Sequence, residues 1–137
     1  MAPVRPHIEN LLGKASWGYD EADPDLIASC FIEDARMSLR IGRDGQLVGP
    51  FEGRAAIRAL HADSMAAQTD QRRHNLSNLW FEKEGEDEAI AVTNLTLLSI
   101  EDGAIRVLSS GWYRDQLVHR DGTWLIADRY VYLDLPY

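Results

Sequence analysis

The sequence predicts an α+β domain in which helices pack on one face of a strongly curved, mainly antiparallel sheet. Two observations support this class. Helical periodicity dominates the first half of the chain, and four long strand-like segments follow one another from Gln71 onward. With 137 residues, the chain is expected to form one domain over residues 1–137, with a core that needs no disulfide or metal.

Three helices are expected in the N-terminal half. The first ends near Asp20 and has apolar residues at three- and four-residue spacing: Ile8, Leu11, Leu12, Ala15 and Tyr19. Asp23-Pro24 predicts the cap and first residue of a short second helix, whose buried stripe runs to Phe31. Gly53 precedes a third helix, from Arg54 to about Gln68, and strands are expected at 35–41 and 47–51.

The second half predicts a meander of four strands, at about 71–84, 88–100, 104–119 and 123–134. Two of its turns are Asp-Gly pairs, Asp102-Gly103 and Asp121-Gly122, which are strong hairpin signals. A long curved sheet wrapped over helices leaves a cone-shaped cavity, and ligand sites favour concave apolar places of this kind.

Composition excludes several classes of partner. The net charge of −8, from 14 Lys+Arg and 22 Asp+Glu, argues against nucleic acid and disfavours anionic membranes. No apolar run reaches membrane-spanning length, and residues 1–10 lack a signal-peptide core. Because the single cysteine, Cys30, cannot form an internal disulfide, a cytoplasmic location is expected. Small neutral ligands remain compatible with this composition.

The motifs for metal and cofactor chemistry are missing. The sequence has no HExxH, CxxC or His-x-His pattern and no glycine-rich phosphate loop. Ser109-Ser110-Gly111 lacks the frame and context of a nucleophile elbow. We therefore expect neither a metal nor a cofactor.

The segment from Gln71 to Phe81 (QRRHNLSNLWF) contains the main candidate base. Strict alternation would place His74, Asn78 and Trp80 on one face of a strand. A histidine there is more often a satisfied core or surface residue than a catalyst. A carboxylate on one ring nitrogen would instead fix the tautomer, raise the basicity of the other nitrogen and make His74 a general base. Asn78 would either orient a substrate oxygen or satisfy backbone groups.

Asp20 is the candidate carboxylate. At the C-terminal end of the first helix it meets the negative end of the helix dipole, an unfavourable placement unless a donor compensates. It is either an exposed acid in the run Asp20-Glu21-Ala22-Asp23 or a carboxylate turned into the cavity beside an imidazole.

Other residues complete the predicted site. Arg129, which alternation places with Leu125, Ala127, Val131 and Leu133, would either pair with an acid or act electrostatically on a ligand. His61 is predicted to pack beside Ile57 and Met65. Five aromatic residues could line a cavity for an aromatic or polycyclic ligand, or else fill the core: Trp17, Tyr19, Trp80, Trp112 and Tyr113.

The order and spacing of several segments resemble the SnoaL-like group of the NTF2-like superfamily. They are Asp23-Pro-Asp-Leu-Ile-Ala-Ser-Cys-Phe31-Ile-Glu-Asp34-Ala35, Gly49-Pro-Phe-Glu-Gly53-Arg-Ala-Ala-Ile57, Arg73-His74-Asn75-Leu76-Ser77-Asn78 and Arg129-Tyr-Val-Tyr-Leu-Asp134. The resemblance covers nearly the whole chain. It implies a cone-shaped α+β barrel that usually assembles into dimers or trimers.

One branch of that group comprises dehydratases and dehydrochlorinases with an Asp–His dyad, such as scytalone dehydratase, bile acid 7α-dehydratase and lindane dehydrochlorinase. Asp20 and His74 match the dyad, and Arg129 matches an active-site arginine of the dehydrochlorinase. Ala15 departs from the pattern, because several dehydratases have a tyrosine there and the dehydrochlorinase a lysine. Tyr19, Asn78 or Arg129 would have to polarise the substrate instead.

The other branch is the small subunit of aromatic-ring-hydroxylating dioxygenases, which is largely structural and shares the strand motif around His74 and the ending at Arg129. The first branch implies a cofactor-independent lyase or isomerase that acts on a small apolar molecule and forms a homo-oligomer. The alternatives are a non-catalytic partner subunit of an oxygenase, a cyclase acting on polyketide or terpenoid intermediates, or a binding module.

Overall fold

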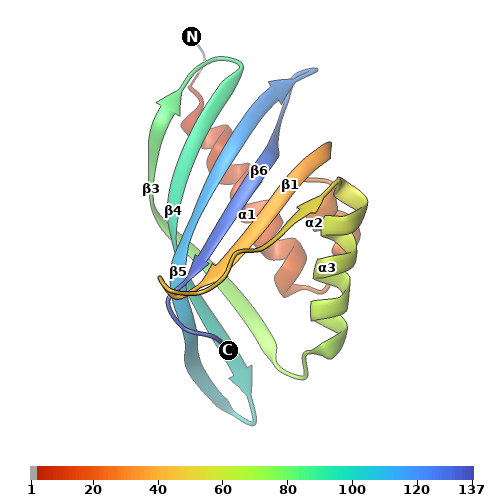
Figure 1. Cartoon of the computed structure of the whole chain (residues 1–137), viewed down its shortest axis with the longest axis vertical. Coiled ribbons are helices and arrows are strands. Elements are labelled where there is room, and N and C mark those ends of the chain that lie inside the picture. Colours follow the sequence, from red (N-terminus) through yellow and green to blue (C-terminus); the bar gives the residue numbers. More distant parts are fainter. Residues whose placement is uncertain (1–2) are drawn as a thin grey trace.

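The computed structural model describes residues 3–137 and contains three helices and one six-stranded mixed sheet (Figure 1). The elements in chain order are α1 (Arg5–Asp20), α2 (Pro24–Ala28), β1 (Phe31–Ile41), β2 (Val48–Glu52), α3 (Arg54–Ala67), β3 (Gln71–Glu84), β4 (Glu88–Glu101), β5 (Ala104–Arg120) and β6 (Thr123–Leu133). The α+β class and the β3–β6 meander are confirmed. None of the helices described is long and apolar enough to span a bilayer.

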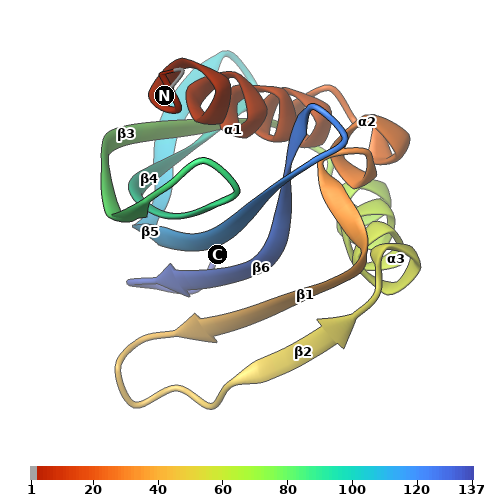
Figure 2. The ribbon, with the colours of Figure 1, turned by 90° about the horizontal axis from the view of Figure 1, so that it is seen from above.

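The sheet is strongly curved, as expected, and its two edge strands do not pair to close a barrel. Its strand order is β2-β1-β6-β5-β4-β3, with β1 and β6 parallel and the other pairs antiparallel. Figure 2 shows the sheet curling, with α1 across its open side next to β3 and α3 beside β1. Helices therefore cover the gap between the edge strands. α3 follows β1 and β2 in the chain, so the three helices do not all precede the sheet.

The second helix is shorter than its apolar stripe predicts. α2 ends at Ala28, and Phe31 already belongs to β1, where it pairs with Ile126. The carbonyl oxygen of Cys30 accepts a hydrogen bond from the Ile126 amide, at 2.8 Å. This pairing with β6 satisfies backbone groups that a continued helix would have used, and it overrides the local helical pattern.

A β-bulge changes the face assignment on β3. Ser77 pairs with Asn94 and Trp80 with Val92, so β3 has one residue more than β4 in this interval. Asn78 takes up the extra residue with a left-handed backbone, φ 56°. Beyond the bulge Trp80 points to the convex side and Asn78 is exposed, contrary to their predicted alternation with His74.

A second bulge lies on β6. Gln116 pairs with Asp128 and Leu117 with Ile126, which leaves one residue of β6 unpaired. Trp124 and Ile126 are therefore buried on the same face as Arg129, although alternation places them on opposite faces.

The left-handed conformation of Asn78 should make this position sensitive to substitution. Asn78→Ala is expected to lower the free energy of unfolding by about 1 kcal/mol, because alanine tolerates this conformation less well than asparagine. Asn78→Gly should cost little, since glycine adopts it freely. Urea unfolding measures both.

The matched control is Asn75→Ala, an exposed position of the same strand that lies outside the bulge. Equal losses for Asn78→Ala and Asn75→Ala would show that the bulge contributes nothing specific to stability.

Candidate functional site

Asp20, the last residue of α1, contacts His74 near the start of β3. The Asp20 Oδ1 atom lies 2.6 Å from His74 Nδ1, and the backbone amide of His74 donates to Oδ2 and Oδ1 at 3.0 and 3.2 Å. The two side chains are only 7% and 10% exposed. Because an ionised carboxylate can only accept a hydrogen bond, Nδ1–H is the donor in this contact and the lone pair of Nε2 remains free.

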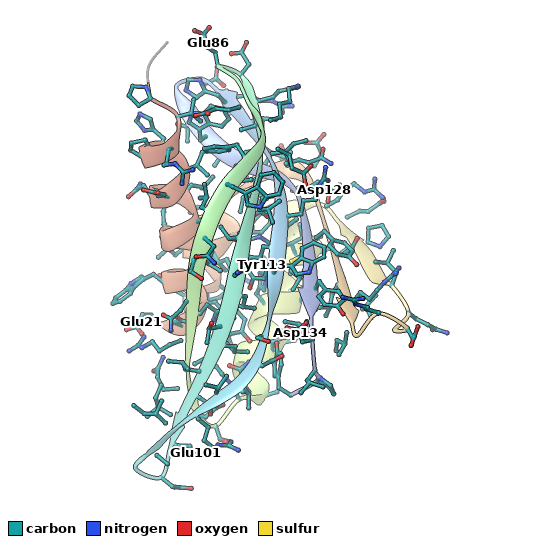
Figure 3. The ribbon with its side chains drawn as sticks, turned by 90° about the vertical axis from the view of Figure 1, so that its left-hand side faces the viewer. Glu21, Glu86, Glu101, Tyr113, Asp128 and Asp134 are labelled. Carbon is teal, nitrogen blue, oxygen red and sulfur yellow. The ribbon has the colours of Figure 1, made fainter. Side chains whose placement is uncertain are left out.

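Several contacts hold the end of α1 against β3. Gln71 donates its side-chain amide to the Asp20 carbonyl oxygen at 2.7 Å, and the carboxylate of Glu21 pairs with Arg73 at 2.8 Å. Figure 3 shows Glu21 beside the lower part of α1, next to β3. Gly18 allows α2 to approach, since a Cβ there would lie 2.8 Å from the Ile27 nitrogen. The N–H groups of His74 and Gln71 thus supply the donors that the negative end of the helix requires.

A small cavity of about 100 Å³ lies beside His74. A dry apolar cavity of roughly 150 Å³ accommodates benzene, so this space suits a very small ligand. Its polar lining comes from Ser16, Tyr19, His61, Ser64, His74, Tyr113, Arg129 and Tyr137. The remaining lining is apolar: Ala15, Ile27, Met37, Leu39, Leu60, Leu95, Leu97, Val131 and Leu133.

An open groove of about 710 Å³ runs between α1 and β3 on the other side of His74. Asp20, Trp17, Asn78 and the buried Thr93 line it, and Ser16 and His74 border both the groove and the cavity. His74 therefore lies in the wall that separates the two spaces.

Two predicted aromatic residues line the cavity. The Tyr19 ring packs edge-on against His74, with centroids 4.7 Å apart, and its hydroxyl bonds to the side-chain amide of Gln68. Tyr113 lies midway along β5 (Figure 3) and is buried. Burial raises the pKa of both phenols, so both remain protonated donors at neutral pH.

The other three aromatic residues do not line this cavity. Trp17 and Trp80 are exposed, although Trp17 borders the outer groove. Trp112 lies on the convex face, where its ring centroid is 5.3 Å from those of Tyr130 and Tyr132. Strand alternation explains the last case, because Trp112 follows a glycine and precedes the inward-facing Tyr113 on β5.

Arg129 pairs with a carboxylate on another strand, which the residues next to Arg129 in the sequence could not predict. Its Nε and Nη2 atoms lie 2.7 and 3.1 Å from the two carboxylate oxygens of Asp115, which stands opposite it on β5. Both side chains are buried, and the guanidinium lies 4.4 Å from the centre of the Tyr113 ring. Of the two alternatives, the ion pair is therefore present, and Arg129 also borders the cavity.

His61 is the second imidazole of the cavity. It lies on α3, is 6% exposed, and its ring centroid is 5.9 Å from that of Tyr19. Burial lowers its pKa to about 4, and the nearby Arg129 and His74 add to the effect. The sequence predicted only a packing role for His61. In the structure it also lines the same cavity as His74. Within residues 3–137, no three His, Cys, Asp or Glu side chains are grouped to hold a metal ion.

The buried, neutral His61 should make stability depend on pH. Its folded pKa of about 4 lies below the unfolded value, so the unfolded chain binds the proton first as the pH falls. This contribution is complete above about pH 6.5 and is lost as the pH falls toward 4. Between pH 7 and 5, wild type should lose about 2 kcal/mol more of its unfolding free energy than His61→Phe.

Urea unfolding at each pH measures this difference in slope, which packing changes alone would not produce. His7→Gln, at an exposed position of α1, is the control and should retain the wild-type slope. An unchanged slope in His61→Phe would mean that His61 is not buried as a neutral group.

Comparison with solved structures reveals the same fold elsewhere. A protein of unknown function from Mycobacterium tuberculosis shares 27% identity over 98% of this chain and 77% of its own, with a TM-score of 0.78. A candidate scytalone dehydratase from Novosphingobium aromaticivorans shares 20% over 96% and 84%, with a TM-score of 0.75. The β subunit of a candidate aromatic-ring-hydroxylating dioxygenase from the same organism shares 14% over 98% and 91%, with a TM-score of 0.82.

The last two likenesses establish the fold alone. A search among curated proteins finds no match. The model of the SnoaL-like domain, however, matches residues 2–130, in agreement with the segments and topology described above. The chain therefore belongs to the SnoaL-like domain family.

Proposed function

We propose that this protein is a cofactor-independent lyase or isomerase that removes a proton from a small, largely apolar molecule. The observation that carries the proposal is the 2.6 Å contact between the carboxylate of Asp20 and the imidazole of His74, which lines a largely apolar cavity. A buried carboxylate bonded to one imidazole nitrogen is the arrangement that prepares the other nitrogen to act as a base.

In this mechanism Asp20 orients His74 and stabilises the imidazolium that forms when Nε2 takes the proton. A positioned general base contributes typically ~10²–10⁴-fold to the rate. The apolar walls hold the substrate and keep bulk water away from the reacting atoms, which strengthens local electrostatic interactions. No group outside the chain is needed for the proton transfer itself.

The other predicted residues have supporting roles in the proposal. Arg129 uses Nε and Nη2 on Asp115, so it acts on a ligand through its field and through the Nη1 group. Tyr19 and Tyr113 shape the cavity. Asn78 and Trp17 border the outer groove, where they would contact a substrate on its way to His74 or a part of it that extends outside. Trp80 and Trp112 have no part in it.

Two substitutions test the base. His74→Gln and Asp20→Asn should each lower turnover by about 10²- to 10⁴-fold, because one removes the base and the other removes the charge that supports it. The substrate would be found by screening small hydroxylated, halogenated and carbonyl compounds, and steady-state kinetics would then compare the variants.

Glu21→Gln is the matched control, since Glu21 is the neighbouring carboxylate and pairs with the outward Arg73. It should keep wild-type turnover. Thermal unfolding verifies that each variant is folded. Full activity of folded His74→Gln and Asp20→Asn proteins would refute the proposal.

A second candidate function is that of a non-catalytic subunit of an oxygenase. One observation favours a protein partner: the β4–β5 hairpin extends past the end of β6 and carries Ile105 and Val107, which are 71% and 68% exposed. Exposed apolar side chains on neighbouring positions of one strand face are typical of interaction surfaces. A homo-oligomer, expected for the enzyme, would use the same surface.

Purification under native conditions separates these functions. A dimer or trimer of this chain alone, measured by light scattering, supports the enzyme, and a stoichiometric complex with a Rieske-type subunit supports the second function. Replacement of both Ile105 and Val107 by aspartate should dissociate either assembly by burying charge in the contact. A wild-type protein that stays monomeric and unpartnered would contradict both assemblies.

A further inference from the structure

Removing a proton from carbon leaves negative charge on the substrate, and a catalyst needs a hydrogen-bond donor where that charge develops. Two positions supply such a donor only in part or not at all. Ala15 borders the cavity with a methyl group only. Arg129 directs Nε and Nη2 to Asp115. The other donors that line the cavity include the Nη1 group of Arg129, the phenol of Tyr113 and the imidazole of His61.

His61 lies where such a donor is required. It reaches the cavity from α3, opposite the strand that carries His74, and both imidazoles line the same space. The Tyr19 ring packs edge-on against each of them, with centroids 5.9 Å from His61 and 4.7 Å from His74. A ligand in this cavity thus lies within reach of both rings.

The protonation of His61 makes it a donor. With a pKa of about 4, its ring is neutral at pH 7 and carries one N–H. Nδ1 is fully buried and has no hydrogen-bond partner among the residues described. Because a buried donor without a partner is rarer than a buried acceptor without one, the proton is placed on Nε2. His61 is then the opposite tautomer to His74, which carries its proton on Nδ1.

We propose that His61 donates a hydrogen bond from Nε2 to the oxygen of a small carbonyl substrate whose α-carbon is deprotonated by His74. This inference rests on the proposed function and names its substrate class: a carbonyl compound with an α-hydrogen. The α-proton moves to Nε2 of His74, the C–H electron pair forms the new C=C bond, and the carbonyl π pair moves to the oxygen bonded to His61. The proton then returns to carbon in an isomerisation or leaves with a β-substituent in an elimination.

Binding of a matched pair of probes tests the donor without any turnover. Acetone accepts hydrogen bonds but cannot donate one, and isobutene has nearly the same shape without the oxygen; both are smaller than benzene and suit this cavity. NMR titration gives the dissociation constant of each probe, which is then corrected for that probe's partition between an apolar solvent and water. After this correction, wild type should bind the ketone about 2- to 12-fold more tightly than the alkene, which corresponds to one hydrogen bond. The infrared carbonyl stretch of the bound ketone should shift to lower frequency.

Three variants locate the donor. His61→Phe should abolish the preference and the infrared shift, and His61→Gln, which keeps an N–H donor, should restore part of both. Tyr113→Phe removes the other buried donor of the cavity that has no described hydrogen-bond partner, and it should change neither.

The inference fails if wild type shows no preference for the ketone, if His61→Phe retains the preference, or if Tyr113→Phe removes it. None of these outcomes bears on the base, which the turnover of the His74 and Asp20 variants tests separately. Conversely, inactive His61 variants with unchanged ketone binding would count against His61 as the donor.

Discussion

The contact between Asp20 and His74 is the constraint on which the rest of the site depends. It joins the last residue of α1 to a residue near the start of β3, 54 residues later in the chain. The carboxylate is buried at the negative end of a helix, and a buried charge without donors would destabilise the fold. The ring and backbone N–H groups of His74 supply those donors, so the same contact fixes α1 over the open side of the sheet and selects the tautomer of the imidazole.

Local sequence signals predicted the elements well because they act over short distances. Apolar periodicity located α1 and α3, and the turns Asp102-Gly103 and Asp121-Gly122 adopt the left-handed backbone that their residue types favour. The extent of α2 was wrong, since pairing of Cys30 with Ile126 on a distant strand ends it early.

Face assignments failed where a strand bulges. An ideal hairpin from the Asp121-Gly122 turn would pair Arg129 with a residue one position from Asp115, and the β6 bulge corrects the register. The bulge at Asn78 likewise turns Trp80 outward. Asp20 and His74 both precede the bulges in the chain. Their contact could therefore be predicted from the end of the first helix and the inward face of the strand. His61 was missed because burial on a helix face suggests packing until the opposing cavity is known.

The charges of the cavity form a consistent set: Arg129 is neutralised by Asp115, His74 is supported by Asp20, and His61 is kept neutral by burial. The central claim is that Asp20 holds His74 as the Nδ1–H tautomer with Nε2 free to accept a proton. Nitrogen-15 NMR of histidine-labelled protein, recorded on the neutral ring, tests it most directly. His74 should show a protonated Nδ1 and an unprotonated Nε2; a proton on Nε2, or rapid averaging of both tautomers, would contradict this assignment.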